Sequence, residues 1–228
     1  WRSFEAVAGV LAGAGAVEGE RDSERARGDG GAGPTATATA MRLLPLGEVA
    51  RSLHGENELW LACLLASPGV QALAPPELAG AVAGVLAGEL GLRPGVRARY
   101  PPSPPVVAAI AALDGTRASL ARLQWRYGVD APLAVDLRLS GVVQAWASGL
   151  DWAAAVADCA LDPGDVARLM QRTVDLLRQA AHCRALPPGL RDAARRAARA
   201  CDRKPIADML VAEERRNILR VVERGGEK

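Results

Sequence analysis

From Glu56 onward, apolar side chains recur at the three- and four-residue spacing of an α-helix almost to the end of the chain. Proline and glycine interrupt this pattern at intervals. Residues that favour strands are sparse, because the chain has one Phe, two Tyr and few Ile, whereas Ala, Leu, Arg and Glu dominate. The sequence therefore predicts a mainly α fold, organised as a helical bundle.

Breaks in the periodic pattern divide the bundle into helices. Gly80, Gly84 and Gly88 recur every four residues in one of them, which in a protein without a membrane span favours close approach of a second helix over membrane dimerisation. Residues 91–105 hold five prolines and are predicted to be a linker. The predicted helices span about 56–66, 75–90, 106–127 (with Arg117, Arg122 and Arg126), 139–148, 151–160, 163–183 and 189–201, and a last charged helix ends near residue 224.

Residues 1–54 differ from the bundle and predict a small mixed α/β segment. A helix is expected from Trp1 to Val17, and the apolar run from Met41 to Leu46 is expected to pair as one strand. Between them, residues 18–40 are charged and then repeat Gly, Ala and Thr, a composition that predicts disorder. The chain starts at Trp1, within a helical pattern and without Met, so we expect it to be a piece of a longer protein.

Several function classes are excluded. No window reaches about 18 uninterrupted apolar residues, so no membrane span is expected. The four cysteines and two histidines lack zinc-site spacing, and each cysteine is expected to be a small core residue in a reducing compartment. Phosphate-binding glycine motifs and catalytic triads are missing, so this chain alone is not expected to catalyse a reaction. The 26 Arg against 2 Lys indicate a GC-rich genome, and a net charge of +2 creates no strong field.

The predicted helix 163–183 is the most informative one. Asp162 is the expected N-cap, Pro163 suits the first helical position, and Asp165 stands where a capping carboxylate belongs. Opposite the apolar face, four polar side chains form a narrow line, which we call the charged stripe. Its members are Arg168, Arg172, Asp175 and Gln179.

The charged stripe has more than one interpretation. Arg168 and Arg172 are like charges one turn apart, which costs a few tenths of a kcal/mol unless an anion relieves it, and guanidinium groups suit phosphate oxygens. The stripe could equally be a solvated surface, in which Arg172 pairs with Asp175 and needs no ligand. Similarly, Trp146 is expected to anchor the core rather than to stack on a base.

Three segments resemble one protein family. Residues 139–179, LSGVVQAWASGLDWAAAVADCALDPGDVARLMQRTVDLLRQ, resemble the C-terminal DSHCT domain of superkiller-type DExH-box RNA helicases, with its WA-x-G helix and its R-x-x-x-R-x-x-(E/D)-L-L helix. Residues 44–65 resemble the end of the family's winged-helix domain and the first bundle helix, and residues 73–89 resemble another bundle helix. The resemblance extends from about residue 43 to residue 210.

The resemblance implies a partial winged-helix segment at 1–54, with the 18–40 insertion at the wing, and a DSHCT-like bundle at 55–210. A charged C-terminal helix or tail at 211–228 has no role in the family and is a possible site for a protein partner. The family's ratchet helix touches single-stranded RNA, and the matching residues are Arg168, Arg172 and Asp175. Arg172 would contact a phosphate or base, and Asp175, one methylene shorter than the family's usual glutamate, would orient it or contact a nucleotide.

By the same resemblance, the chain itself holds no cofactor, because ATP and Mg belong to two RecA-like motor domains that lie outside it and act as its partners. The implied location is the chloroplast, with the nucleus or cytoplasm as the alternative. Two other functions stay open. One is a stand-alone helical interaction scaffold without RNA or ATPase activity. The other, a winged-helix DNA-binding protein, is disfavoured because residues 1–54 hold at most half of such a domain.

Overall fold

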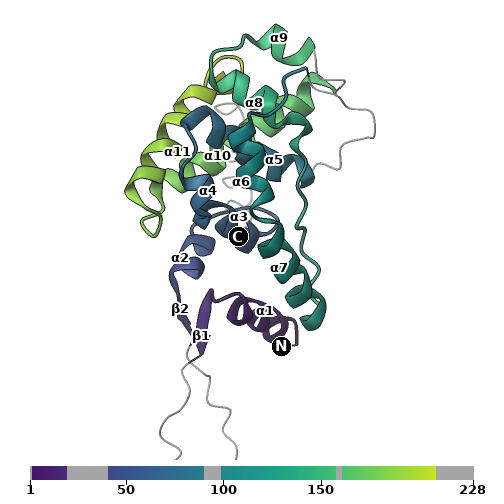
Figure 1. Cartoon of the computed structure of the whole chain (residues 1–228), viewed down its shortest axis with the longest axis vertical. Helices are drawn as coiled ribbons and strands as arrows, with labels where there is room; N and C mark the ends of the chain where they lie inside the picture. The colour runs from purple at the N-terminus through teal and green to yellow at the C-terminus, as the bar shows by residue number, and fades with distance from the viewer. Residues whose placement is uncertain (1, 20–40, 90–98, 158–160, 209–228) are drawn as a thin grey trace, which may run out of the picture.

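The computed structural model describes residues 2–19, 41–89, 99–157 and 161–208 (Figure 1). In this part of the chain the fold is mainly α, as predicted, with one small two-stranded sheet. Its elements are α1 (Arg2–Gly13), β1 (Val17–Gly19), β2 (Met41–Leu43), α2 (Pro45–Arg51), α3 (Glu58–Ala66), α4 (Pro68–Gln71), α5 (Pro75–Glu89), α6 (Pro104–Ala111), α7 (Asp114–Tyr127), the 3₁₀ helix η1 (Leu137–Leu139), α8 (Ser140–Ala147), α9 (Trp152–Ala157), α10 (Pro163–His182) and α11 (Pro188–Cys201).

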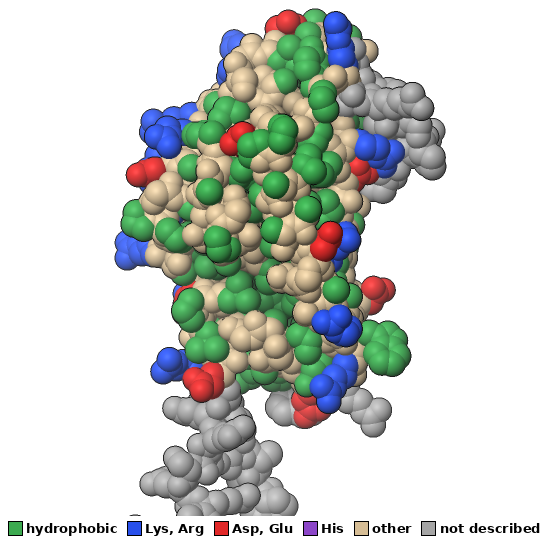
Figure 2. Space-filling view, in the orientation of Figure 1, with side chains coloured by type: hydrophobic (Ala, Val, Ile, Leu, Met, Phe, Trp, Pro, Cys, Tyr) green, Lys and Arg blue, Asp and Glu red, His purple; other side chains and the backbone are tan. Residues whose placement is uncertain are grey.

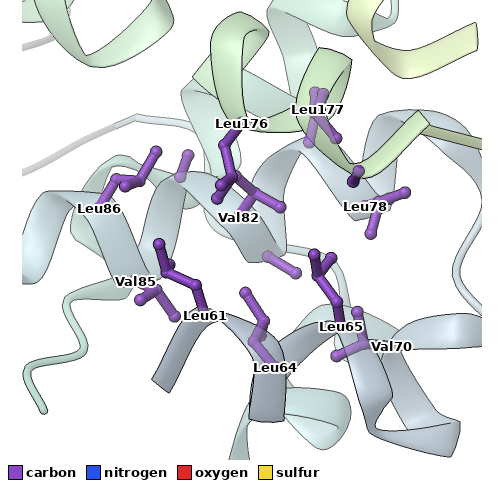
Figure 3. Packing of buried hydrophobic residues seen from close by; sticks show 14 of the residues in the cluster. Leu61, Leu64, Leu65, Val70, Leu78, Val82, Val85, Leu86, Leu176 and Leu177 are labelled. Atoms are coloured by element: carbon purple, nitrogen blue, oxygen red, sulfur yellow. The ribbon is translucent and has the colours of Figure 1, made fainter. Parts of the chain in front are cut away.

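Helix α5 is the centre of the bundle. Every residue from Leu78 to Ala87 is buried, which explains why this stretch has no charged side chain. Around α5 lie α6, α8, α10 and α11. Figure 3 shows that Leu61 and Leu64 of α3 reach toward α5 from one side, while Leu176 and Leu177 of α10 reach toward it from the other. One continuous apolar core therefore joins both ends of the bundle.

The three spaced glycines of α5 permit a close approach. Gly80 faces the helix α8, as predicted, whereas Gly84 faces η1 and Gly88 faces the non-helical segment before it. A side chain at Gly88 would have its Cβ 2.7 Å from the carbonyl carbon of Ala134, and one at Gly84 would lie 2.6 Å from Cδ2 of Leu137. The short distance allows polar contacts between the backbones of these segments. The hydroxyl of Ser140 donates to the carbonyl of Gly80 at 2.5 Å, and the N–H of Asp136 donates to the carbonyl of Gly84 at 2.7 Å.

One predicted helix is wrong: residues 106–127 form two helices, α6 and α7, separated at 112–113. The N–H of Leu113 donates to the carbonyl of Ile110 at 3.0 Å, three residues back, which tightens the last turn of α6. The two helices then pack on different neighbours, since α6 lies against α4 and α5 whereas α7 lies against α1 and α3. Helical periodicity continues through the break, so the sequence pattern alone does not reveal it.

The N-terminal segment combines α1 with an antiparallel pair of strands. The predicted helix 1–17 is too long, because α1 ends at Gly13 and Val17 already lies in β1. The cause is a Schellman motif: Gly15 adopts a φ of 70°, the N–H of Ala16 donates to the carbonyl of Leu11, and the N–H of Gly15 donates to that of Ala12.

Strand β1 pairs with β2 in antiparallel register, with Val17 opposite Leu43. The predicted disordered insertion 18–40 therefore loses its first two residues to β1, and residues 20–40 lie outside the described part of the chain. The domain limits 1–54, 55–210 and 211–228 stay predictions.

Candidate nucleic-acid interface

Helix α10 begins as its sequence predicts. Asp162 is the N-cap, and its Oδ1 accepts a hydrogen bond from the N–H of Gly164 at 2.7 Å, while Pro163 occupies the first turn. The carboxylate of Asp165 lies 2.9 Å from Nη2 of Arg168, one turn further along. Both members of this ion pair are exposed, so it contributes little to stability and leaves Arg168 available to other anions.

The inner face of α10 is buried as predicted. Thr173, the polar member of this face, satisfies its hydroxyl by donating to the carbonyl of Leu169 at 2.8 Å. The predicted core positions, all confirmed as buried, are Val166, Leu169, Met170, Thr173, Leu176, Leu177 and Ala180. Packing against α5 and α11 along this whole face holds the helix firmly in place.

The charged stripe lies on the opposite, outer side of α10. The side chain of Arg168 is 69% exposed and that of Asp175 is 52% exposed, whereas Arg172 between them is half-buried. Oδ1 of Asp175 lies 3.7 Å from Nη1 of Arg178, so this acid also faces a cation on its own helix. The structure thus brings the three predicted residues to one surface, with charges of both signs.

The stripe ends at a contact that sequence reasoning missed. The backbone N–H of His54 donates to Oε1 of Gln179 at 2.8 Å, which ties the last residue of the stripe to the segment between α2 and α3. A second contact fixes the same end, since Nη2 of Arg178 lies 2.7 Å from Oδ2 of Asp202, beyond α11. Both contacts join residues far apart in the chain, and no local pattern signals them.

Trp146 is a core anchor, as expected, because only 1% of it is exposed. Its Nε1 donates to the carbonyl of Cys201 at 2.9 Å, and its ring meets that of Trp152 edge to face, with centroids 6.0 Å apart. A base has no access to this indole.

The cysteines in the described part of the chain are also core residues. Cys63, Cys183 and Cys201 are buried and unbridged, and Cys159 lies outside the described residues. Burial raises the pKa of the Cys63 thiol to about 11. It is also the main reason why the pKa of the Cys201 thiol is raised to about 12. Among the residues that the structure describes, no three His, Cys, Asp or Glu side chains are grouped as metal ligands.

None of the helices in the described ranges is both long enough and apolar enough to cross a bilayer.

Sequence similarity to known proteins identifies the family of this chain. The sequence model of the DSHCT (NUC185) domain matches residues 40–208. The chain belongs to this family. The resemblance found in the sequence is therefore confirmed, as is the bundle fold that it implied. The match begins at residue 40, on the N-terminal side of the predicted limit at 54.

The chain is also similar to a complete protein with a known name. The chain is 41% identical over 169 residues, or 73% of its length, to an Arabidopsis thaliana protein named DExH-box ATP-dependent RNA helicase DExH15, chloroplastic. The matched residues span 14% of that helicase's own length. This DSHCT chain therefore corresponds to a small part of its relative.

Proposed function

We propose that this DSHCT chain is the C-terminal RNA-contacting module of an ATP-dependent DExH-box RNA helicase. The observation that carries the proposal is the 41% identity to a protein named as such a helicase. ATP and Mg²⁺ would be bound by RecA-like motor domains elsewhere in the same polypeptide, and those domains would be partners of the module. The chloroplast is the proposed location, because the relative's name states it.

Within the module, we propose that the charged stripe on α10 contacts single-stranded RNA. The buried inner face gives α10 a fixed position, so the outer guanidinium groups are presented from a rigid frame. Arg168 and Arg172 stand four residues apart, or about 6 Å along the helix axis. A phosphate between them would relieve their mutual repulsion and accept charge-assisted hydrogen bonds.

The acids beside these arginines reduce the positive charge of the surface that would contact RNA. Asp165 pairs with Arg168, and Asp175 faces Arg178, so these acids offset part of the positive charge on this side of α10 and the stripe creates no broad positive field. RNA affinity would then come from a few direct contacts. Each phosphate contact contributes about 0.7 to the slope of log affinity against log salt for a single strand. Two contacts predict a contribution of about 1.4, which is small and measurable.

The test is binding of a short, labelled single-stranded RNA to the whole chain at several salt concentrations. Replacing both Arg168 and Arg172 with Ala should weaken binding and flatten the salt slope by about 1.4. Arg195→Ala is the matched control, because Arg195 forms the same i,i+3 ion pair, with Asp192, on the neighbouring helix α11. Unchanged affinity and an unchanged salt slope in the double variant would contradict the RNA contact and show that the stripe is only a solvated surface.

Asp175 provides a second test, in which two roles give opposite signs. Removing a carboxylate from an RNA-binding surface strengthens binding if the acid only repels phosphates. If Asp175 orients Arg172 or contacts a nucleotide, as we propose, Asp175→Ala weakens binding instead. Tighter binding by this variant would contradict the orienting role while leaving the arginine contacts in place.

The helicase assignment has its own test, which uses a longer polypeptide carrying this module with the motor domains. In that polypeptide, Arg172→Ala should lower the rate of RNA unwinding while leaving the melting temperature nearly unchanged. Normal unwinding by this variant would contradict the proposed role of Arg172. Absence of a nucleotide-binding lysine loop and a DExH-type box from the coding sequence ahead of the module would contradict the assignment itself.

A further inference from the structure

Helix α7 carries the most exposed large hydrophobic side chain in the described part of the molecule, Trp125, which is 87% exposed. Removing an indole from water is favourable, and most tryptophans find at least partial cover in a folded protein. Trp146 and Trp152, for example, pack against each other. Trp125 belongs to a regular helix in the middle of the chain, so its exposure is a property of the folded surface.

The helix geometry directs Trp125 away from the elements that α7 packs on. Leu120 and Gln124 are buried and mark the inner side of α7. Tyr127 covers Gly9 of α1, where an added Cβ would overlap its ring. At 100° per residue, Trp125 lies about 140° from Leu120 and about 160° from Tyr127 around the helix axis. Trp125 is therefore separate from the contact between α1 and α7.

On the same side of α7, the neighbours of Trp125 are small or cationic. Arg122 lies one turn before it and Arg126 directly follows it, and both are exposed. Nη2 of Arg122 donates to the hydroxyl of Ser119 at 2.9 Å, which draws this guanidinium back along α7. Ala118 and Ala121, on the same side of the helix, are exposed and add only methyl groups. Where α7 ends at the lower right of Figure 1, Figure 2 shows a hydrophobic side chain that protrudes from the edge of the molecule, with Lys or Arg side chains beside it and an Asp or Glu side chain above it.

This surface suits a nucleic acid better than a protein. A protein-docking face needs contiguous apolar area, whereas this one has a single ring between two cations. The carboxylate of α7, Asp114, sits at the far end of the helix, 3.1 Å from Nη2 of Arg117. Aromatic side chains that stack on bases, combined with cations that contact phosphates, are the usual means of binding single-stranded nucleic acid.

We infer that Trp125, Arg122 and Arg126 form a second single-stranded RNA contact on α7, distinct from the charged stripe on α10. One base stacks on the exposed face of the indole, and the two guanidinium groups bind the phosphates on either side of that nucleotide. Because every base has a stacking face, this contact tolerates any sequence. The inference depends on RNA being a ligand of the chain, as proposed above, but it does not depend on α10.

The test compares Trp125→Ala with the unaltered chain in binding a short single-stranded uridine oligomer, followed by fluorescence anisotropy. Loss of one stacked base is worth about a 5- to 150-fold drop in affinity. Trp125→Phe should recover part of it, because Phe keeps a stacking face. Val107→Ala is the control, since Val107 is an exposed apolar residue on α6 (43%). Unchanged affinity of Trp125→Ala would overturn the inference.

An abasic strand of the same length separates stacking from a general effect on folding. It keeps the phosphates but has no base to stack, so Trp125→Ala and the unaltered chain should bind it equally. An equal loss of affinity on both strands would overturn the stacking role. Arg122→Ala and Arg126→Ala should each flatten the salt slope by about 0.7 on either strand.

The two RNA contacts can fail independently. If the α10 double variant binds normally while Trp125→Ala binds weakly, the α7 contact is supported and the proposed role of the charged stripe is wrong. If the α10 double variant binds weakly while Trp125→Ala binds normally, the charged stripe is supported and the inferred α7 contact is wrong. If the unaltered chain binds no RNA, both are overturned. A concentration-dependent dimer that Trp125→Ala abolishes, without any change in RNA affinity, would make this surface a protein interface.

Discussion

The guanidinium of Arg203 lies over the indole of Trp146, with its Cζ 3.8 Å from the ring centroid. The same guanidinium donates from Nη2 to the carbonyls of Trp146 at 2.6 Å and Leu150 at 2.8 Å. Since Nε1 of Trp146 donates to the carbonyl of Cys201, the link runs in both directions. These contacts join the end of α8 to the segment that follows α11, near the end of the family match.

We therefore predict that Arg203→Ala destabilises the bundle. The change removes a cation–π contact and the hydrogen bond to the carbonyl of Leu150, whereas the carbonyl of Trp146 keeps the N–H of Gly149 as a donor at 3.0 Å. We expect a loss of about 2–4 kcal/mol of unfolding free energy. Arg203→Lys should lose less, because it keeps the charge but not the planar fork. Urea unfolding followed by circular dichroism measures both. Lys204→Ala, at an 83% exposed position, should change the free energy by less than about 0.5 kcal/mol.

A second prediction concerns two glycines with opposite surroundings. A Cβ on Gly141 would overlap the carbonyl oxygen of Tyr100, a backbone atom that cannot rotate away, so Gly141→Ala should destabilise by about 1–3 kcal/mol. Gly115 lies in helix α7 with nothing within 4 Å of an added Cβ. Gly115→Ala should stabilise by about 0.4–1 kcal/mol through the unfolded state. Thermal melts of both variants check the sign, and equal effects would contradict the packing described here.

These glycines also show how far the sequence could predict the fold. Local signals sufficed for α10, because Asp162 and Pro163 define its start and its apolar period defines its buried face. They also sufficed for the close approach to α5, since three glycines at four-residue spacing have few other uses. The contact of Gly141 with Tyr100 could not be predicted, because it depends on where a loop distant in sequence comes to rest.

The candidate site shows the same division. The helical wheel placed Arg168, Arg172 and Asp175 on the surface opposite the core, as the structure does. The exposure of Trp125 was not foreseen, because a tryptophan within a helical pattern is by default a core residue. After the break between α6 and α7, helix α7 packs on α1 and α3, and Trp125 lies on its solvent side. The link from His54 to Gln179 had no local signal at all.

The third prediction concerns acid sensitivity at Asp136. Its carboxylate caps η1 by accepting from the N–H of Arg138 at 3.0 Å and also pairs with that guanidinium. Burial by itself would raise the pKa of Asp136, but the hydrogen bonds and charge of Arg138 outweigh it and hold this pKa below its usual value. The folded state therefore favours the ionised form.

A depressed pKa contributes stability above the unfolded value of about 3.9, and that contribution is lost as the pH falls through the folded value. Asp136→Asn should therefore melt at a lower temperature than the unaltered chain at pH 7, and the gap should narrow as the pH falls below about 4, through the lowered pKa of Asp136. Asp114→Asn, which removes an acid from an exposed pair with Arg117, should change the melting temperature little at pH 7. A gap that stays constant down to pH 3 would contradict the role assigned to Arg138.

The last prediction concerns the reactivity of the buried thiols. The thiolate is the reactive form, and burial raises the pKa of Cys63 to about 11 and that of Cys201 to about 12, so almost none is ionised at pH 7.5. In a Cys159→Ser variant, whose remaining thiols are the three described ones, Ellman's reagent should react slowly with the folded chain and rapidly in urea. Adding Arg203→Ala should speed the reaction of Cys201 selectively, because that side chain helps to hold the segment after Cys201 against Trp146. Prompt reaction of Cys63 or Cys201 in the folded chain would show that the core around them opens readily, which the packing described here does not allow.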